Sequence, residues 1–103
     1  MRGSALHVNN KQYFVYIVAD SRPTLYVGVT NNLLRRVYEH RQGLVEGFTK
    51  QYCLHKLIYY EIFNDVSHAI EREKQIKHWN RSWKLNLIKK LNPTFSDLYD
   101  TLI

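Results

Sequence analysis

Residues 25–40 read LYVGVTNNLLRRVYEH, and this stretch passes from one kind of regular structure to another. Its first part, Leu25 to Val29, is rich in β-branched and apolar residues and predicts a strand. Its second part repeats apolar residues at helical spacing from Leu33 onward. A tight glycine-containing turn over residues 28–32 would therefore join a strand to a helix.

Polar residues predict where this helix starts and stops. Thr30 or Asn31 can cap its first turn, because a short side-chain oxygen there accepts a free backbone N–H. The helix then runs to about Gln42, and Gly43 ends it.

The same rules predict the rest of the chain as an α+β domain of order ββαβαα, in which a small three-stranded sheet, antiparallel or mixed, is flanked by helices. The run 13–18 reads as a strand buried on both faces, and the turn at 20–23 makes a hairpin of the first two strands. The further elements are a strand over 56–63, a helix from Asp65 or Ser67 to about Trp79, a helix from Ser82 to Leu91 ending at Asn92-Pro93, and one or two helical turns after Phe95.

The chain has 103 residues, enough for one modest core, and we expect a flexible N-terminus over 1–11 and a single domain over 12–103. Fifteen Lys and Arg against nine Asp and Glu favour a polyanionic partner, with nucleic acid ahead of a membrane surface. Cys53 is the single cysteine, so an internal disulfide and a cysteine zinc cluster are excluded. With no membrane-length apolar run and no signal-peptide core, the expected location is the cytoplasm.

One carboxylate falls on an apolar helix face. At about 100° per residue, Glu73 lies within the stripe formed by Val66, Ala69, Ile70, Ile76 and Trp79, whereas Glu71 lies on the opposite face. A carboxylate that faces a core is costly unless it is paired, hydrogen-bonded or bound to a cation. Glu73 is therefore either a metal-binding or acid–base group, or a surface residue that pairs with an arginine.

The helix after Leu33 carries two candidate polar residues beside its apolar stripe. Arg36 and His40 lie one turn apart and can act on one ligand near the sheet. Arg35 and Glu39 are expected to point outward into solvent. The alternative for Arg36 and His40 is a pair of ordinary rim residues.

Two tyrosines occur at matching places in the predicted hairpin. Tyr16 in the first strand and Tyr26 in the second would lie side by side on one face of an antiparallel pair. Taken singly, each is more simply a core aromatic residue. Together with Arg36, His40 and Glu73, they form a set from four elements that one surface could hold.

A second basic feature runs from Lys74 to Lys90. Basic residues there are interleaved with Trp79 and Trp83, an arrangement that can follow a phosphate backbone while an indole stacks on a base. The alternative is a solvated helix pair with both indoles in the core. The predicted nucleic-acid-binding residues are Arg35, Lys74, Lys77, Arg81 and Lys84.

These residues resemble the GIY-YIG nuclease superfamily, particularly its small stand-alone bacterial members. Val15-Tyr16-Ile17, without the leading glycine, and Tyr26-Val27-Gly28 resemble its two strand motifs. Arg36, eight residues after that glycine, matches the family's essential arginine, and His40 matches a histidine of many members. Glu73, four residues after an alanine, matches the metal-binding glutamate, and Asn92 is a candidate for an asparagine that many members use.

The resemblance, over about residues 12 to 98, implies hydrolysis of DNA phosphodiesters with Mg²⁺ or Mn²⁺ and no small-molecule cofactor. Glu73 would hold the ion, and Arg36 would neutralise charge on the phosphate. Tyr16 or Tyr26, helped by His40, would orient or deprotonate the attacking water, which requires a lowered tyrosine pKa. Members act in repair, restriction and intron homing, so a structure-specific repair or recombination endonuclease is the leading expectation.

Two other readings stay open. A module of the same fold that binds nucleic acid without catalysis would show salt-sensitive binding and no cleavage. A protein-interaction or structural domain would bind neither DNA nor RNA. Since larger relatives use a separate domain to bind specific DNA and 103 residues leave no room for one, a homodimer or a larger protein partner would have to supply specificity.

Overall fold

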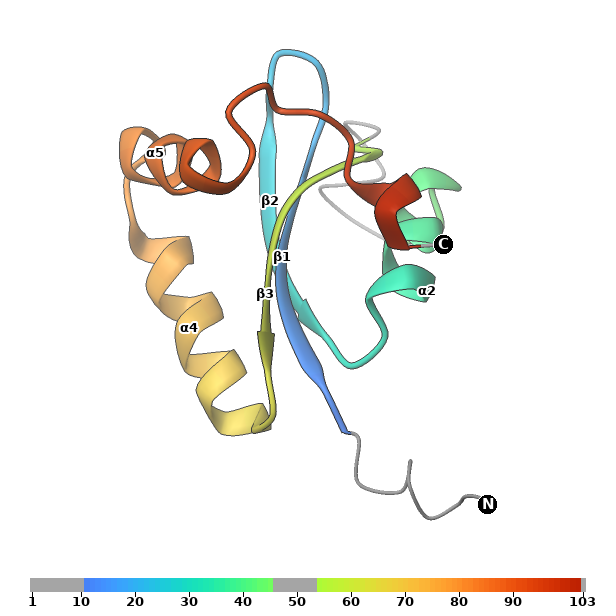
Figure 1. The fold of residues 1–103 in the computed structure, drawn as a ribbon, viewed down its shortest axis with the longest axis vertical. Coiled ribbons are helices and arrows are strands. Elements are labelled where there is room, and N and C mark those ends of the chain that lie inside the picture. The colour runs from blue at the N-terminus through green and yellow to red at the C-terminus, as the bar shows by residue number, and fades with distance from the viewer. Residues whose placement is uncertain (1–10, 46–53, 103) are drawn as a thin grey trace.

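The computed structural model describes residues 11–45 and 54–102. A three-stranded sheet forms the middle layer, made of β1 (Tyr13–Ala19), β2 (Leu25–Thr30) and β3 (Lys56–Phe63) in the order β2-β1-β3. Helices α4 (Val66–His78) and α5 (Arg81–Leu91) cover one face, and α2 (Leu33–Arg41) with the short helix η1 (Tyr99–Leu102) lies on the other (Figure 1). The ββαβαα order is confirmed, and both strand pairs are antiparallel.

The central strand β1 has a core on each side, which is why its sequence is continuously apolar. Val15, Ile17 and Ala19 point into a first core beneath α4 and α5. Tyr16 and Val18 point into a second core beneath α2 and η1. The exposed fraction of every residue from Val15 to Ala19 is 2% or less, as predicted for a strand buried on both faces.

The helix starts differ from the predictions in two places. The cap of α2 is Asn32, whose side chain accepts the Arg35 backbone N–H at 3.1 Å, because Thr30 is still paired with Phe14 at the end of β2. The cap of α5 is Asn80 rather than Ser82, and it accepts the Trp83 N–H at 2.9 Å.

Other boundary predictions are confirmed. Asp65 caps α4. Gly43 ends α2 with a φ of 71°, and a pair of backbone hydrogen bonds, Gly43 N–H to His40 and Leu44 N–H to Glu39, closes the helix in the usual glycine-terminated motif.

The C-terminal segment is tied to the start of β3. The Leu98 N–H donates to the Leu57 carbonyl at 2.7 Å, and the Leu57 N–H donates to Asp97 at 3.1 Å. These bonds satisfy backbone groups that an edge strand would otherwise present to solvent. The predicted flexible N-terminus falls almost entirely outside the described residues, and Cys53 also lies outside them.

Candidate active site

Tyr16 and Gly28 face each other across the β1–β2 hairpin. They are register partners, so their Cα atoms lie opposite one another on neighbouring strands. A Cβ atom on residue 28 would lie 2.5 Å from the Tyr16 hydroxyl oxygen and 2.6 Å from its Cζ. The Tyr16 ring therefore lies directly over the Gly28 backbone, in space that any other residue would occupy. Gly28 belongs to β2 and not to the turn, which corrects the expected turn over residues 28–32.

Three aromatic rings meet on this face of the sheet. Tyr26 lies on the same face as Tyr16, as predicted, but diagonally from it rather than directly beside it, with ring centroids 6.4 Å apart. The His40 ring comes from α2 and lies 5.5 Å from the Tyr16 ring and 5.4 Å from the Tyr26 ring. The Tyr16 hydroxyl and His40 Nε2 are hydrogen-bonded at 2.9 Å. Tyr16 and His40 are buried, whereas Tyr26 is partly open to solvent.

Burial sets the proton affinities of the hydrogen-bonded pair. It raises the pKa of Tyr16 well above the ordinary value, Tyr26 adds to this effect, and the Arg36 charge opposes it only in part. Burial and Arg36 together lower the pKa of His40 to about 4. At neutral pH, Tyr16 is thus a protonated phenol and His40 a neutral imidazole. A tyrosine that acts as a base would need a lowered pKa, but the site raises the pKa of Tyr16.

The second ring nitrogen of His40 takes no part in the bond to Tyr16. His40 Nδ1 is buried and has no hydrogen-bond partner among the described residues. Since a buried N–H without a partner is rarer than a buried acceptor without one, we assign the proton to Nε2. In that tautomer Nε2–H donates to the Tyr16 oxygen, and the Tyr16 proton is free to point elsewhere.

The two adjacent arginines separate as expected, but Glu39 does not lie fully in solvent. The Arg35 side chain is 63% exposed and the Arg36 side chain 39%. Glu39 lies between them, 3.8 Å from Arg35 Nε and 3.3 Å from Arg36 Nη1. Because ion pairs this exposed contribute little, on the order of 1 kcal/mol or less, Arg36 can exchange Glu39 for another anion at small cost.

Glu73 comes from α4, on the other face of the sheet, and its ion-pair partner Lys77 connects it to Tyr26. Its side chain is 11% exposed, and Oε2 lies 2.6 Å from Lys77 Nζ, one turn further along α4. The same ammonium lies 5.9 Å from the centre of the Tyr26 ring. The Glu73 charge also contributes to the raised pKa of Tyr16. Glu73 is buried on its helix and Glu71 is exposed, as the helical wheel predicts, but Val66 and Ile70 lie at the surface.

The donor set at Glu73 fits a hard divalent cation that keeps most of its water. Among residues 11–45 and 54–102, His, Cys, Asp and Glu form no group of three that could enclose a metal ion. A single carboxylate suits Mg²⁺, which commonly binds one or two carboxylates together with water and substrate phosphate. The ammonium of Lys77 already provides a positive charge at Glu73 Oε2, so a cation is electrostatically compatible with this position.

Asn92 is placed away from these residues. It is the C-cap of α5, and its amide nitrogen donates to the carbonyls of Ile58 and Ser96. Its oxygen accepts the Ser96 N–H. The side chain thus joins α5, β3 and the C-terminal segment, and a catalytic role for it stays a prediction. Of the predicted DNA-binding residues, Arg81 donates to the Pro23 carbonyl at 2.6 Å, while Lys74 is exposed and Lys84 half-buried.

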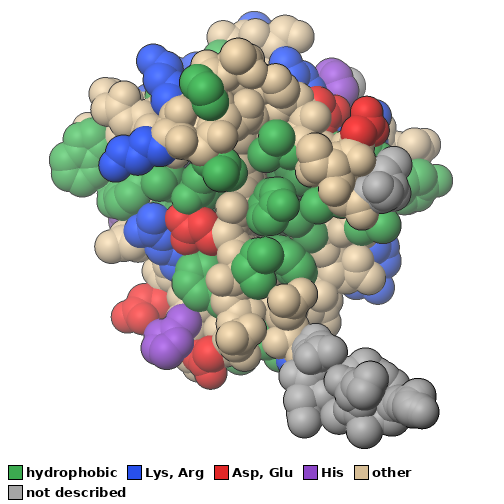
Figure 2. All heavy atoms as spheres, viewed as in Figure 1, with side chains coloured by type: hydrophobic (Ala, Val, Ile, Leu, Met, Phe, Trp, Pro, Cys, Tyr) green, Lys and Arg blue, Asp and Glu red, His purple; other side chains and the backbone are tan. Residues whose placement is uncertain are grey.

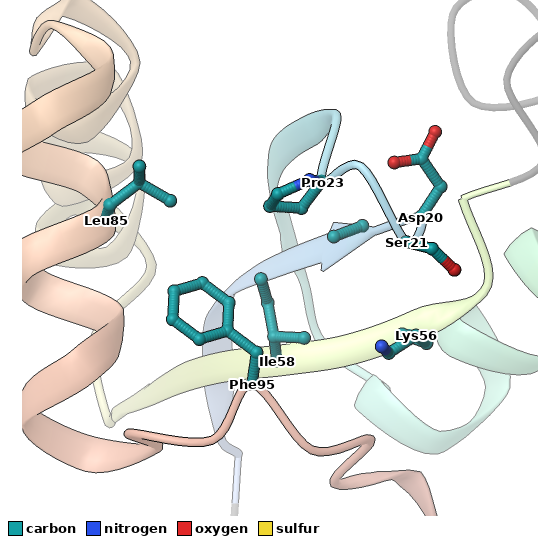
Figure 3. Close-up of a pocket in the computed structure, with 8 residues that line it drawn as sticks. Asp20, Ser21, Pro23, Lys56, Ile58, Leu85 and Phe95 are labelled. Carbon is teal, nitrogen blue, oxygen red and sulfur yellow. The ribbon is translucent and has the colours of Figure 1, made fainter.

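A cavity of about 240 Å³ lies elsewhere, between the β1–β2 loop, β3 and α5 (Figure 3). Its walls are mainly apolar, with Pro23, Leu85 and Phe95 around the opening and Asp20 at the rim. The Asp20 carboxylate is occupied by Arg22 and the Thr24 N–H. None of the five catalytic candidates lines this cavity, so it is not the candidate active site.

Sequence reasoning missed two features of the site. The first is the need for glycine at position 28, which becomes visible once the hairpin register pairs it with Tyr16. The second is the contact of Lys77 with Glu73, for which the spacing of four residues on a helix was an available signal.

The comparisons with known proteins identify the family. Residues 12–86 match the GIY-YIG catalytic domain. A UPF0213 protein of Syntrophus aciditrophicus is 41% identical over 81 residues, which cover 78% of this chain and 92% of that protein. A UPF0213 protein of Staphylococcus aureus is 38% identical over 78 residues, covering 76% and 95% of the two chains.

One solved structure is similar in fold. The solution NMR structure of a UPF0213 protein from Bacillus halodurans gives a TM-score of 0.55, with 84% of this chain and 92% of that chain covered. At 23% identity, this similarity supports the fold and nothing further. Separately, no helix in the part of the chain that the structure describes combines the length and the apolarity needed to cross a membrane.

Proposed function

This chain belongs to the GIY-YIG family, within its UPF0213 group of small bacterial proteins, and on that basis we propose that it is a divalent-metal-dependent endonuclease that hydrolyses DNA phosphodiester bonds. The observation that carries the proposal is that side chains from four elements act on or pack around Tyr16. Tyr16, Tyr26 and His40 pack ring to ring, and the charges of Arg36 and Glu73 both act on the Tyr16 hydroxyl.

The two tyrosines have different roles in this proposal. Tyr16 keeps its proton, so it donates a hydrogen bond to a phosphate oxygen while His40 holds its ring in place. Tyr26 is the tyrosine that solvent reaches, so it accepts a hydrogen bond from the attacking water and orients it. His40, neutral at physiological pH, adds no positive charge that would draw the phosphate away from Arg36.

Charge on the phosphate is met by two groups. Arg36 leaves Glu39 and donates to the non-bridging oxygens, where its forked guanidinium suits a phosphate. Glu73 is the residue that would hold Mg²⁺ or Mn²⁺, and the bound ion would stabilise the leaving oxygen as a Lewis acid. Glu73 can bind the ion only when its ion pair with Lys77 breaks, and the Lys77 ammonium is then available to a phosphate of the DNA.

The test is cleavage of supercoiled and branched DNA with Mg²⁺, Mn²⁺ or excess chelator. We expect chelator and Glu73→Gln to abolish cleavage, and Arg36→Ala to lower kcat about a hundredfold or more. Glu71→Gln is the matched control on α4, because Glu71 is exposed on the polar face and should leave cleavage unchanged. Arg35→Ala should weaken substrate binding more than kcat, since Arg35 is the exposed neighbour. Cleavage by Glu73→Gln at the wild-type rate would refute the proposed metal ligand.

The Lys77–Glu73 ion pair also favours a second candidate function. If this pair persists on DNA, the carboxylate stays neutralised and the domain binds nucleic acid without cutting it. That function predicts salt-sensitive DNA binding and no cleavage with any divalent metal. Lys77→Ala tests the cause, because removing the ammonium frees Glu73 and should allow cleavage with Mg²⁺ if this ion pair is what blocks it.

The finer parts of the proposal concern the biological setting. We place the activity in the cytoplasm, on structured DNA formed in repair or recombination, with RNA as the competing substrate. A homodimer or a larger protein partner would supply the specificity that a single small domain lacks.

A further inference from the structure

The outer face of α5 carries a small slot between two indoles. Its helix residues recur at spacings of three and four, so they share one side of α5, and Trp79 from the end of α4 completes the wall. The slot has a volume of about 170 Å³ and is lined by Trp79, Trp83, Asn86, Leu87 and Lys90. It shares no residue with the catalytic candidates.

The two indoles differ in how firmly they are held. Trp79 packs against the first core, and the Arg72 guanidinium lies 5.2 Å from the centre of its ring. Trp83 meets Trp79 edge to face, with centroids 5.9 Å apart and an interplanar angle of 77°, yet 57% of Trp83 is exposed. A fixed inner wall thus supports a large aromatic side chain that water reaches. The exposed indole therefore offers a flat face on which a planar ring can stack.

The charges around the slot favour an anionic partner. From Lys74 to Ser96 the sequence contains no Asp or Glu. Within the described residues, Lys84, Lys89 and Lys90 have no acidic partner. Figure 2 shows basic and hydrophobic side chains next to one another over α5, at the upper left of that view. A partner must therefore offer both negative charge and a flat apolar face.

We propose that this slot binds an unpaired base of single-stranded DNA. The base stacks on the Trp83 indole, the Asn86 amide hydrogen-bonds an edge of the base, and Lys90 contacts the neighbouring phosphate. A base inside a duplex cannot enter, because both of its faces are already covered by its neighbours. The choice of DNA rests on the proposed function. The slot itself needs no cleavage.

The slot also lies apart from Glu73. Trp79 follows Glu73 by six residues, which is roughly 9 Å of rise along α4 and about 120° around its axis. Single-stranded DNA held in the slot therefore lies beyond the cleavage site rather than in it. This placement predicts a preference for substrates with unpaired nucleotides beside the bond that is cut.

Binding is measured in excess chelator, where nothing is cut, with a short oligothymidylate, an abasic oligomer with the same number of phosphates, and a blunt hairpin duplex. We expect the oligothymidylate to quench tryptophan fluorescence. Trp83→Leu should weaken its binding about five- to 150-fold and leave the abasic oligomer and the duplex unaffected. Trp83→Phe should restore most of the affinity. Leu91→Ala is the matched control, since Leu91 is 54% exposed on the same helix and does not line the slot.

Three results would overturn the inference: no binding of the oligothymidylate by the wild type, unchanged affinity in Trp83→Leu, or an equal loss for the abasic oligomer, which would mean that the slot contributes only charge. Circular dichroism shows whether each variant is folded. The results for the slot and for the nuclease proposal are independent. Binding that depends on Trp83 without cleavage by any metal would support the slot and refute the nuclease. Cleavage together with normal binding by Trp83→Leu would support the nuclease and refute the slot.

Discussion

Replacing Gly28 by alanine should destabilise the protein through a collision with Tyr16. The new Cβ would lie 2.5 Å from the Tyr16 oxygen, 2.6 Å from Cζ and 2.9 Å from Cε1, all closer than carbon and oxygen atoms approach. Tyr16 cannot withdraw easily, because its ring is buried in the second core and its hydroxyl is bonded to His40. One side of the collision is therefore a fixed aromatic ring rather than the end of a flexible chain.

The expected loss follows from three terms. Overpacking a core costs about 1–3 kcal/mol, and losing the Tyr16–His40 hydrogen bond costs about 1 kcal/mol. Removing a glycine from a strand returns roughly 0.5–1 kcal/mol. The free energy of unfolding should fall by about 2 kcal/mol, which for a domain of this size lowers Tm by roughly 10 °C.

The assay is urea unfolding followed by circular dichroism, with Tyr16→Leu as the second mutation of a double-mutant cycle. In the Tyr16→Leu protein no ring lies over position 28, so Gly28→Ala should cost close to nothing there. If Gly28→Ala is as stable as the wild type, or costs the same in both backgrounds, the close approach of ring and backbone does not hold.

Three further predictions concern other parts of the molecule. The pKa of His40 is about 4 in the folded state and 6.5 in the unfolded chain, so the unfolded state binds more protons between these values. The free energy of unfolding should therefore fall as pH falls from about 6.5 to 4. NMR titration of the His40 ring should give a midpoint near 4. Arg72→Leu leaves the half-buried Glu61 carboxylate without its bidentate partner and should cost about 2–3 kcal/mol in urea unfolding, with a rise in the low pKa of Glu61 seen by carboxyl NMR. Asn92→Ala should lower the unfolding free energy by about 1–3 kcal/mol while kcat for DNA cleavage stays within about twofold, since its amide binds only backbone groups away from the site; a large drop in kcat would instead support a catalytic role.

How far the fold could be predicted depends on whether local forces decide each feature. The strand over 13–18, the helix that Gly43 ends and the helix that Asp65 caps were predictable, because apolar spacing and capping chemistry act within a few residues. The caps Asn32 and Asn80 were not, since several polar residues in a row could serve and the choice fell to how far each neighbouring element extends.

The sequence alone determined which residues are candidates for chemistry. Residue type and spacing selected two tyrosines, Arg36, His40 and a glutamate on an apolar helix face, and the spacing of four between Glu73 and Lys77 was already visible. These are properties of the covalent chain, and no tertiary contact is needed to recognise them.

Only the tertiary structure decided what each candidate can do. Burial against the sheet keeps Tyr16 protonated and His40 neutral. Packing of α4 brings the charges of Glu73 and Lys77 within range of tyrosines on the other face of the sheet. Proton affinity depends on the dielectric surroundings and on charges that lie distant in sequence, so it becomes defined only when the layers pack.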